Sequence, residues 1–202
     1  MDPFLRGVVI GFAIAAPVGP IGVLCIRRTI AGGMRIGFVS GLGAAIADAL
    51  YAGIATFALA LATAYVARLT QPLHLIGGAF LLWLGVTTAL RAAPAAGAGR
   101  PAPRAYAGAF LSTFALTAVN PATIVSFAAV IAGAVFGAQP PVGFAAVRLV
   151  AGVFAGSALW WLVLSAGVGI VRRGLTPRAM RAVNVVSGIV LAGFGVWALA
   201  YR

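Results

Sequence analysis

Long apolar stretches separated by short polar segments run through this sequence. An α-helix needs about 20 mostly apolar residues to cross a lipid bilayer. The stretches that approach or exceed this length cover residues 4–26, 36–64, 73–90, 108–136, 146–171 and 183–200. The segments between them are too short to form a soluble domain. The pattern therefore predicts an all-α, polytopic membrane protein with six transmembrane helices.

The composition agrees with a membrane protein. Hydrophobic residues make up 63% of the 202 residues, and charged residues make up 8%. A soluble domain of this length cannot hide so much apolar surface, whereas lipid can surround it. The net charge of +12 comes from 14 basic residues, all of them arginines. Because the arginines lie at helix ends and in loops, we expect the lipid bilayer as a partner and no nucleic acid.

The arginines also predict the orientation of the chain. Most of them fall after the first, third and fifth apolar stretches. These are Arg27, Arg28 and Arg35; Arg91, Arg100 and Arg104; and Arg172, Arg173, Arg178 and Arg181. Positive charge concentrates in cytoplasmic loops. We therefore expect these three segments in the cytoplasm and both termini outside, in the inner membrane of a bacterium.

The two halves of the chain resemble each other. Three pairs of segments match in the same order: FAIAAPVGP with FALTAVNPA, GAAIADALY with GVFAGSALW, and GAFLLWLGV with GIVLAGFGV, beginning at residues 12 and 114, 43 and 152, and 78 and 188. Each copy holds three helices, an odd number, so the second copy must cross the membrane the other way up. This inverted repeat is typical of secondary transporters. We expect repeats at 1–91 and 107–202, joined by a Pro/Gly/Ala-rich linker at 92–106.

Prolines interrupt the first and fourth predicted helices at equivalent places. Pro17, Gly19 and Pro20 lie inside the first apolar stretch. A proline inside a helix removes a backbone hydrogen bond and costs about 3 kcal/mol. Asn120 and Pro121 stand at the matching place of the second half, next to Thr117 and Thr123. The sequence predicts two discontinuous helices whose free N–H groups suit a carboxylate ligand at the bilayer midplane. Ordinary proline kinks are the alternative.

Asp48 is one of two acidic residues in the chain, and the other is Asp2. A carboxylate at the centre of a membrane helix costs about 2.5–3.5 kcal/mol on insertion scales, so such a residue usually faces an interior cavity. We expect Asp48 to bind a proton or a cationic ligand there. Tyr51, three residues further on, lies on the same helix face and is expected to donate to it. Ser157 takes the equivalent place in the second half. A purely structural carboxylate is the alternative.

Small residues at four-residue spacing mark a ridge on the second predicted helix. They are Gly37, Gly41, Ala45 and Ala49, and Gly152 and Gly156 repeat the pattern in the fifth helix. Such ridges let helices approach closely. We expect packing within one molecule here, with a homodimer seam as the alternative. The tryptophans, Trp83, Trp160, Trp161 and Trp197, are expected to pack or to face the membrane.

The segment GFAIAAPVGPIGVLCIRRTIAGGMRIGFVSGLGAAIADALYA, residues 11–52, resembles the LysE family (LysE/RhtB type) of amino-acid exporters. The Asn-Pro pair of the fourth helix, the central linker and the chain length agree with this resemblance. It implies export of basic amino acids, or of homoserine, threonine and similar small ones. It also points to Pro17, Gly19 and Pro20, to Asp48, and to the Asn120-Pro121 pair. Val18 departs from the family's common Pro-Gly-Pro, which leaves the subgroup and the substrate open.

Together these features predict a secondary transporter that exports small or basic amino acids, or close derivatives, across the bacterial cytoplasmic membrane. The resemblance implies coupling to the proton gradient or the membrane potential. One alternative is a metal-ion transporter of the same superfamily, although a lone acid beside His74 and Cys25 makes a poor metal site. The other is a membrane protein without transport activity. No catalytic constellation can be assembled, so we expect no enzyme and no cofactor.

Overall fold

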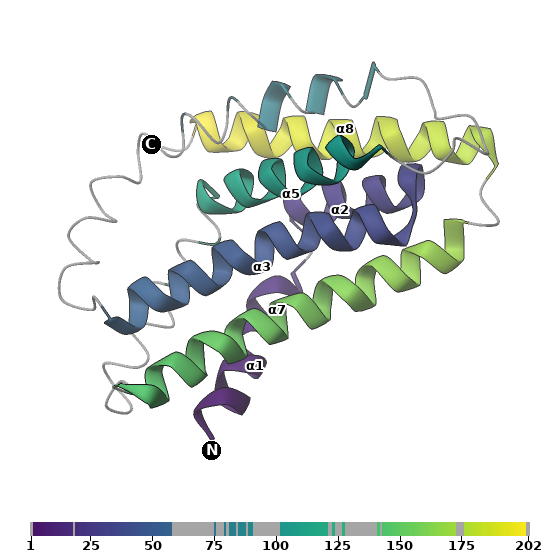
Figure 1. The fold of residues 1–202 in the computed structure, drawn as a ribbon. Coiled ribbons are helices and arrows are strands. Elements are labelled where there is room, and N and C mark those ends of the chain that lie inside the picture. The colour runs from purple at the N-terminus through teal and green to yellow at the C-terminus, as the bar shows by residue number, and fades with distance from the viewer. Residues whose placement is uncertain are drawn as a thin grey trace.

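The computed structural model describes residues 2–17, 19–57, 102–120, 143–172 and 176–200, together with a few positions in the segments between them. In these ranges the regular secondary structure is helical. The described helices are α1 (Pro3–Ala15), α2 (Pro20–Gly32), α3 (Met34–Phe57), α5 (Pro103–Ala118), α7 (Phe144–Val171) and α8 (Pro177–Ala200). Figure 1 shows them as a bundle in which α3 and α7 lie side by side through the middle.

Two of the described helices are long and apolar enough to cross a membrane, over Met34–Thr56 and Phe144–Val171. The pair α1 and α2 counts as a third span if it is taken as one bent helix. These spans correspond to the predicted stretches 36–64, 146–171 and 4–26. Eight of the 18 residues of the stretch 73–90, most of residues 122–136 and most of the linker lie outside the described residues. The total of six spans therefore stays a prediction.

Prolines begin most of the described helices. Pro3, Pro20 and Pro103 each stand in the first turn, where the missing N–H would have had no helical partner. Asp2 caps α1, because its Oδ1 accepts a hydrogen bond from the Phe4 N–H at 2.9 Å. α5 begins at Pro103, which lies inside the predicted linker 92–106. α2 ends at Gly33, whose φ of 97° suits a residue without a Cβ.

Glycines bring the helix backbones into direct contact. A Cβ on Gly7 or Gly11 of α1 would collide with backbone atoms of α7, and a Cβ on Gly152 or Gly156 of α7 would collide with backbone atoms of α1. Gly43 of α3 lies equally close to the backbone of α5. These contacts confirm that Gly152 and Gly156 pack within one molecule, as the small-residue pattern predicted.

The order of the contacts gives the direction of each helix. Along α1, Phe4, Val8 and Phe12 meet successively later residues of α7, so these two helices are parallel. α3 runs parallel to α5 in the same way, with Gly43 near Phe110 and Tyr51 bonded to Ala118. α3 runs antiparallel to α7, since Met34 packs on Gly169, Gly41 on Trp161 and Asp48 on Ser157.

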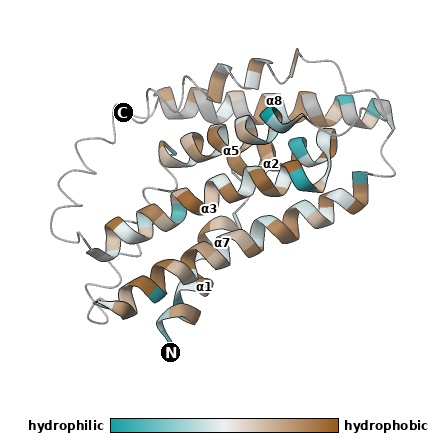
Figure 2. Ribbon diagram, in the orientation of Figure 1, coloured by the Kyte–Doolittle hydropathy of each residue, from teal (hydrophilic) through white to brown (hydrophobic). Residues whose placement is uncertain are grey.

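Hydrophobic residues are frequent along the long helices (Figure 2), and many of them are exposed. Large exposed hydrophobic side chains include Leu50 and Ile54 of α3, Val163 and Ile170 of α7, and Ile189 of α8. A soluble protein rarely leaves apolar patches this extensive in water. The exposed faces therefore fit a lipid environment.

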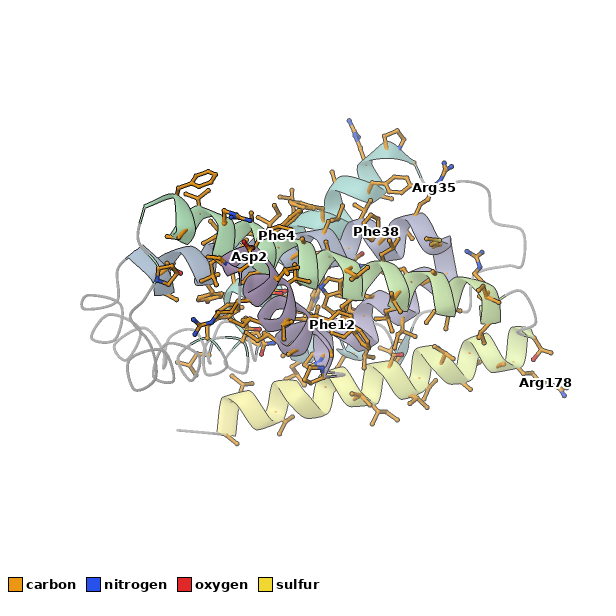
Figure 3. The ribbon with its side chains drawn as sticks, turned by 90° about the horizontal axis from the view of Figure 1, so that it is seen from below. Asp2, Phe4, Phe12, Arg35, Phe38 and Arg178 are labelled. Atoms are coloured by element: carbon orange, nitrogen blue, oxygen red, sulfur yellow. The ribbon has the colours of Figure 1, made fainter. Side chains whose placement is uncertain are left out.

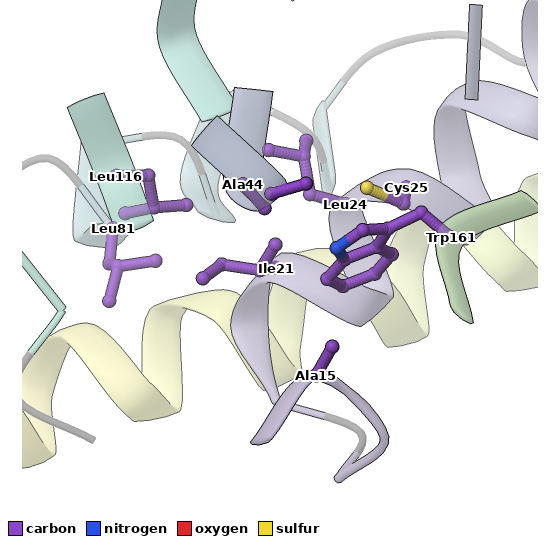
Figure 4. Packing of buried hydrophobic residues seen from close by; sticks show 9 residues of the cluster. Ala15, Ile21, Leu24, Cys25, Ala44, Leu81, Leu116 and Trp161 are labelled. Atoms are coloured by element: carbon purple, nitrogen blue, oxygen red, sulfur yellow. The ribbon is translucent and has the colours of Figure 1, made fainter. Parts of the chain in front are cut away.

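The buried core gathers where the junction of α1 and α2 meets α3, α5 and α7. Ile21, Leu24 and Cys25 of α2 pack against Trp161 of α7 and Leu116 of α5 (Figure 4). Cys25 is completely buried in this cluster. The first bend of the chain is thus packed into the centre of the bundle.

The position of Arg28 differs from the one predicted from the sequence. It was counted with loop arginines, but the structure places it in α2 with its guanidinium among neighbouring helices. Its Nη1 donates to Ser40 Oγ at 3.1 Å, to the Ala109 carbonyl at 2.8 Å and to Thr113 Oγ1 at 2.7 Å, and its Nη2 donates to Ser112 Oγ at 2.7 Å. A hydropathy pattern indicates an exposed position for an arginine. It does not show that oxygen atoms of neighbouring helices can accept the hydrogen bonds of the guanidinium inside the bundle.

Candidate functional site

The first predicted transmembrane helix is broken. α1 ends at Ala15 and α2 begins at Pro20, and the two helix axes meet at 82°. Gly19 is extended, with φ −107° and ψ −165°, and the start of α2 has no side-chain cap. The predicted departure from α-helix at Pro17–Pro20 is confirmed. Without a cap, the first N–H groups of α2 need partners from elsewhere.

The fourth predicted helix stops at the matching place. α5 ends at Ala118, and the Asn120 N–H donates to the Thr117 carbonyl at 3.1 Å, a contact within the final turn. Pro121 lies outside the described residues. The end of α5 and the break between α1 and α2 both border one cavity, so the two interruptions lie close together, as the sequence predicted.

This cavity has a volume of about 170 Å³. Its described wall comes from α3, from α7, from the junction of α1 and α2, and from residues at and just after the end of α5. The lining residues are Ile14, Ala15, Pro17, Gly19, Pro20, Ile21, Gly22, Ala44, Asp48, Thr117, Asn120, Thr123 and Trp161. Pockets for drug-sized ligands usually measure about 300–1,000 Å³. The space therefore suits a small molecule.

The cavity unites most of the residues singled out from the sequence. Pro17, Gly19, Pro20, Asp48, Thr117 and Asn120 all line it. Tyr51 and Ser157 do not belong to its described wall, although Ser157 contacts Asp48 directly. Residues separated by more than 100 positions in the chain thus meet at one place.

Asp48 is 3% exposed and lies at the wall of the cavity. Its Oδ2 accepts a hydrogen bond from Ser157 Oγ at 2.7 Å. Ser157 Oγ in turn accepts one from Trp161 Nε1 at 3.2 Å. Since an indole N–H can only donate, it occupies a lone pair of the serine and leaves the hydroxyl proton for Asp48. The carboxylate is therefore held by a chain of two hydrogen bonds from α7.

The predicted hydrogen-bond partner of Tyr51 was wrong. We expected its hydroxyl to donate to Asp48, but it donates to the Ala118 carbonyl at 2.5 Å. The last carbonyls of a helix have no partner inside the helix, and α5 ends at Ala118. Tyr51 also stacks on Phe127, with ring centroids 5.7 Å apart. Its role in this structure is to hold the end of α5.

Trp161 is the residue of the site that the sequence interpretation missed. It was expected to pack or to face the membrane. It does pack in the buried core, where it is 3% exposed, and it also lines the cavity, which was not expected. Its spacing gave a usable signal, because Trp161 follows Ser157 by one helical turn and thus lies on the same face of α7. Thr123, also named only in passing, lines the cavity as well.

A helical membrane protein with a broken helix and a lone acid at a central cavity has the architecture of a transporter. The chain belongs to the LysE type translocator family, whose family model matches residues 12–202. The resemblance found in the sequence is thereby confirmed.

Three relatives match over most of their length. The chain is 30% identical to the "Chemotactic transduction protein ChpE" of Pseudomonas aeruginosa, covering 97% of each chain. It is 27% identical to the "Putative amino acid efflux protein YcgF" of Bacillus subtilis, over 98% of this chain and 95% of that one. It is 27% identical to the "Uncharacterized membrane protein YahN" of Escherichia coli, over 86% and 77%. No solved structure gives a significant match.

Proposed function

We propose that this protein is a secondary transporter that exports small or basic amino acids, or close derivatives, across the bacterial cytoplasmic membrane. The observation that carries the proposal is the position of Asp48, a buried acid at the wall of a small cavity beside a broken helix. Buried acids in membrane helices mark substrate or ion pathways. The name of the Bacillus subtilis relative, which refers to amino acid efflux, supports the choice of substrate class.

Two parts of the cavity wall offer complementary chemistry for an amino acid. Asp48 supplies a negative charge for the ammonium group. Gly19, Pro20, Ile21 and Gly22 bring the start of α2, which has no side-chain cap, into the wall of the same cavity. Free N–H groups and the positive end of the helix dipole favour an anion such as the substrate carboxylate. A zwitterion therefore fits the site with each charge near its complement.

Protonation provides a route for release. The pseudo-symmetric partner of Asp48 is the neutral Ser157, so the matched pair carries one acid. An ammonium ion bound to a single carboxylate loses its counter-charge when that carboxylate takes a proton. Coupling to the proton gradient follows from this cycle, and coupling to the membrane potential follows from the charge that moves with a basic substrate.

The helix contacts support six spans built as two inverted repeats, 1–91 and 107–202. In such a repeat, α1 of the first half corresponds to α5 of the second half, and α3 corresponds to α7. The parallel pair α1 and α7 therefore corresponds to the pair α5 and α3, which is also parallel. The equivalent helices α3 and α7 meet at Asp48 and Ser157, the residues matched in the sequence. Gly85, in the third predicted span, packs against Gly188 of α8. Rocking of one repeat against the other would open the cavity to each side in turn.

The alternatives receive no comparable support. The described residues contain no group of three His, Cys, Asp or Glu side chains that could hold a metal ion, so no observation favours a metal-ion transporter. The ChpE name refers to chemotactic transduction, which concerns that relative and adds no feature to this cavity.

An export assay tests the proposal. Cells that lack other amino-acid exporters are fed dipeptides of alanine, threonine, leucine or lysine, and the free amino acid is measured outside the cells over time. Cells that express the protein should release at least one of these amino acids faster than cells with an empty vector. Equal release for the whole panel, with the protein present in the membrane, would contradict the proposal.

A further inference from the structure

Trp161 provides the aromatic part of the cavity wall. Among the described residues that line the cavity it is the single aromatic one. Its apolar neighbours in the wall, such as Ile14, Ala15, Ile21 and Ala44, are small or aliphatic. A large flat ring therefore limits the width of the cavity on the α7 side.

The ring has little freedom to move. Gly41 of α3 lies so close to the Trp161 side chain that even a methyl group at Gly41 would collide with it. The indole also packs beside Ile21 and Cys25 of α2 (Figure 4), and its Nε1 is bonded to Ser157. A side chain fixed by packing and by a hydrogen bond cannot turn aside to admit a longer ligand.

We propose that Trp161 is the specificity-determining residue of this transporter, because its fixed ring occupies the space that a longer amino-acid side chain would need. This inference rests on the proposed function, in which the cavity binds the exported amino acid. In a close-fitting apolar site, one methylene group more or less changes discrimination by about 10- to 200-fold. A change in the size of this ring should therefore change which amino acids are exported.

The adjacent tryptophan supplies a matched control. Trp160 packs edge-to-face on Phe12 of α1, with ring centroids 5.3 Å apart, and it is absent from the described cavity wall. Trp161→Phe and Trp160→Phe therefore remove the same atoms at neighbouring positions. Only the first of these changes enlarges the cavity.

The test uses the dipeptide-fed export assay with alanine, threonine, leucine and lysine. The measured quantity is the export rate of leucine divided by that of the best wild-type substrate, at matched protein levels in the membrane. If leucine is itself the best substrate, phenylalanine replaces it as the larger probe. Trp161→Phe should raise this ratio by roughly tenfold, and Trp160→Phe should leave it at the wild-type value.

Other outcomes separate the two proposals. An unchanged ratio for Trp161→Phe, or an equal rise for Trp160→Phe, overturns the role of Trp161 and leaves the transport function standing. If Trp161→Phe does not accumulate in the membrane, Trp161→Tyr is measured in its place, with the same expectation and the same refuting result. If the wild-type protein exports none of the amino acids, the proposed function fails, and this inference fails with it.

Discussion

Asp48 illustrates how one side chain can be kept ionisable inside a membrane protein. The Ser157 hydroxyl donates to one of its oxygen atoms, and the carboxyl group also faces the cavity. A buried carboxylate without such partners would be strongly disfavoured. The hydrogen bond from α7 and access to the cavity together offset part of the cost of burying the carboxylate. Under the proposed function it binds the ammonium group of the substrate there.

The charge of Asp48 is expected to be essential for export. Asp48→Asn keeps the size of the side chain and an oxygen that can accept from Ser157, so the protein should still reach the membrane. Removing one partner of a buried charge pair costs about 2–5 kcal/mol. We therefore expect the export rate of the best substrate to fall by at least about 30-fold, as measured in the dipeptide-fed assay.

The other acid of the chain gives the control for this change. Asp2 forms an ion pair with Arg148 at 2.8 Å, with both side chains partly exposed. Exposed ion pairs contribute about 0–1 kcal/mol, so Asp2→Asn should retain export. Wild-type export by Asp48→Asn at equal protein levels would show that the carboxylate is structural.

For single residues, the sequence predicted the features that depend on residue type. It missed the features that depend on the direction in which a side chain points. Asp48 stood out as a lone acid in an apolar stretch, and the prolines marked the break. Tyr51 was assigned the wrong partner, because the end of α5 at Ala118 offers a carbonyl that spacing along α3 does not show. Trp161 was overlooked, because an aromatic residue at helical spacing looks the same whether it faces lipid or a cavity.

Among the described helices, α2 is joined to its neighbours by arginine side chains. The guanidinium of Arg28 connects it to Ser40 of α3 and to the α5 residues Ala109, Ser112 and Thr113. At its C-terminal end, Arg172 Nη1 donates to the Thr29 carbonyl at 3.3 Å. The broken first span thus has one half that is bound into the bundle by arginine side chains.

Loss of the Arg28 contacts is expected to destabilise the protein. Hydrogen bonds from charged groups contribute about 1.5–3 kcal/mol each in soluble proteins, and side-chain hydrogen bonds within membranes average about 0.6 kcal/mol. Arg28→Met should therefore cost roughly 2–3 kcal/mol in total. For a chain of this size that lowers Tm by roughly 4–12 °C, measured by thermal unfolding in detergent.

Arg35→Met removes the same charge at the start of α3 and is the control for Arg28→Met. Arg35 is exposed, so we expect a smaller fall in Tm. Equal Tm values for Arg28→Met and the wild type would contradict the stabilising role of the guanidinium.

The sequence predicted where helices begin better than where they end. Proline and Asp2 mark the beginnings of α1, α2 and α5, since the missing N–H suits the first turn. The predicted first stretch ended at residue 26, whereas α2 continues to Gly32. Arg27 and Arg28 lower the local hydropathy, and the oxygen atoms that accept from Arg28 become visible only when the helices are assembled.

For the whole molecule, the directions of the described helices form a consistent set. In a chain with six alternating spans, the first and fifth spans run the same way, and so do the second and fourth. α1 with α7 and α3 with α5 have these directions, and α3 with α7 has the opposite one that a second and a fifth span require. The same directions place Asp2 and Arg148 at one end of the bundle. Figure 3 shows Arg35 and Arg178 toward the other end.

This arrangement predicts which residues face each side of the membrane. With the arginine-rich segments in the cytoplasm, Asp2 and Arg148 face the outside and Arg35 and Arg178 face the cytoplasm. Single cysteines are introduced at these positions in a Cys25→Ser background, and intact cells are treated with a membrane-impermeant maleimide. Cysteines at 2 and 148 should react in intact cells, whereas those at 35 and 178 should react only after the membrane is permeabilised.

The reverse pattern would overturn the predicted orientation of the protein in the membrane but would leave the fold unchanged. Reaction of all four from one side would contradict the membrane-spanning arrangement, because the two ends of the bundle could not then lie on opposite sides of the bilayer.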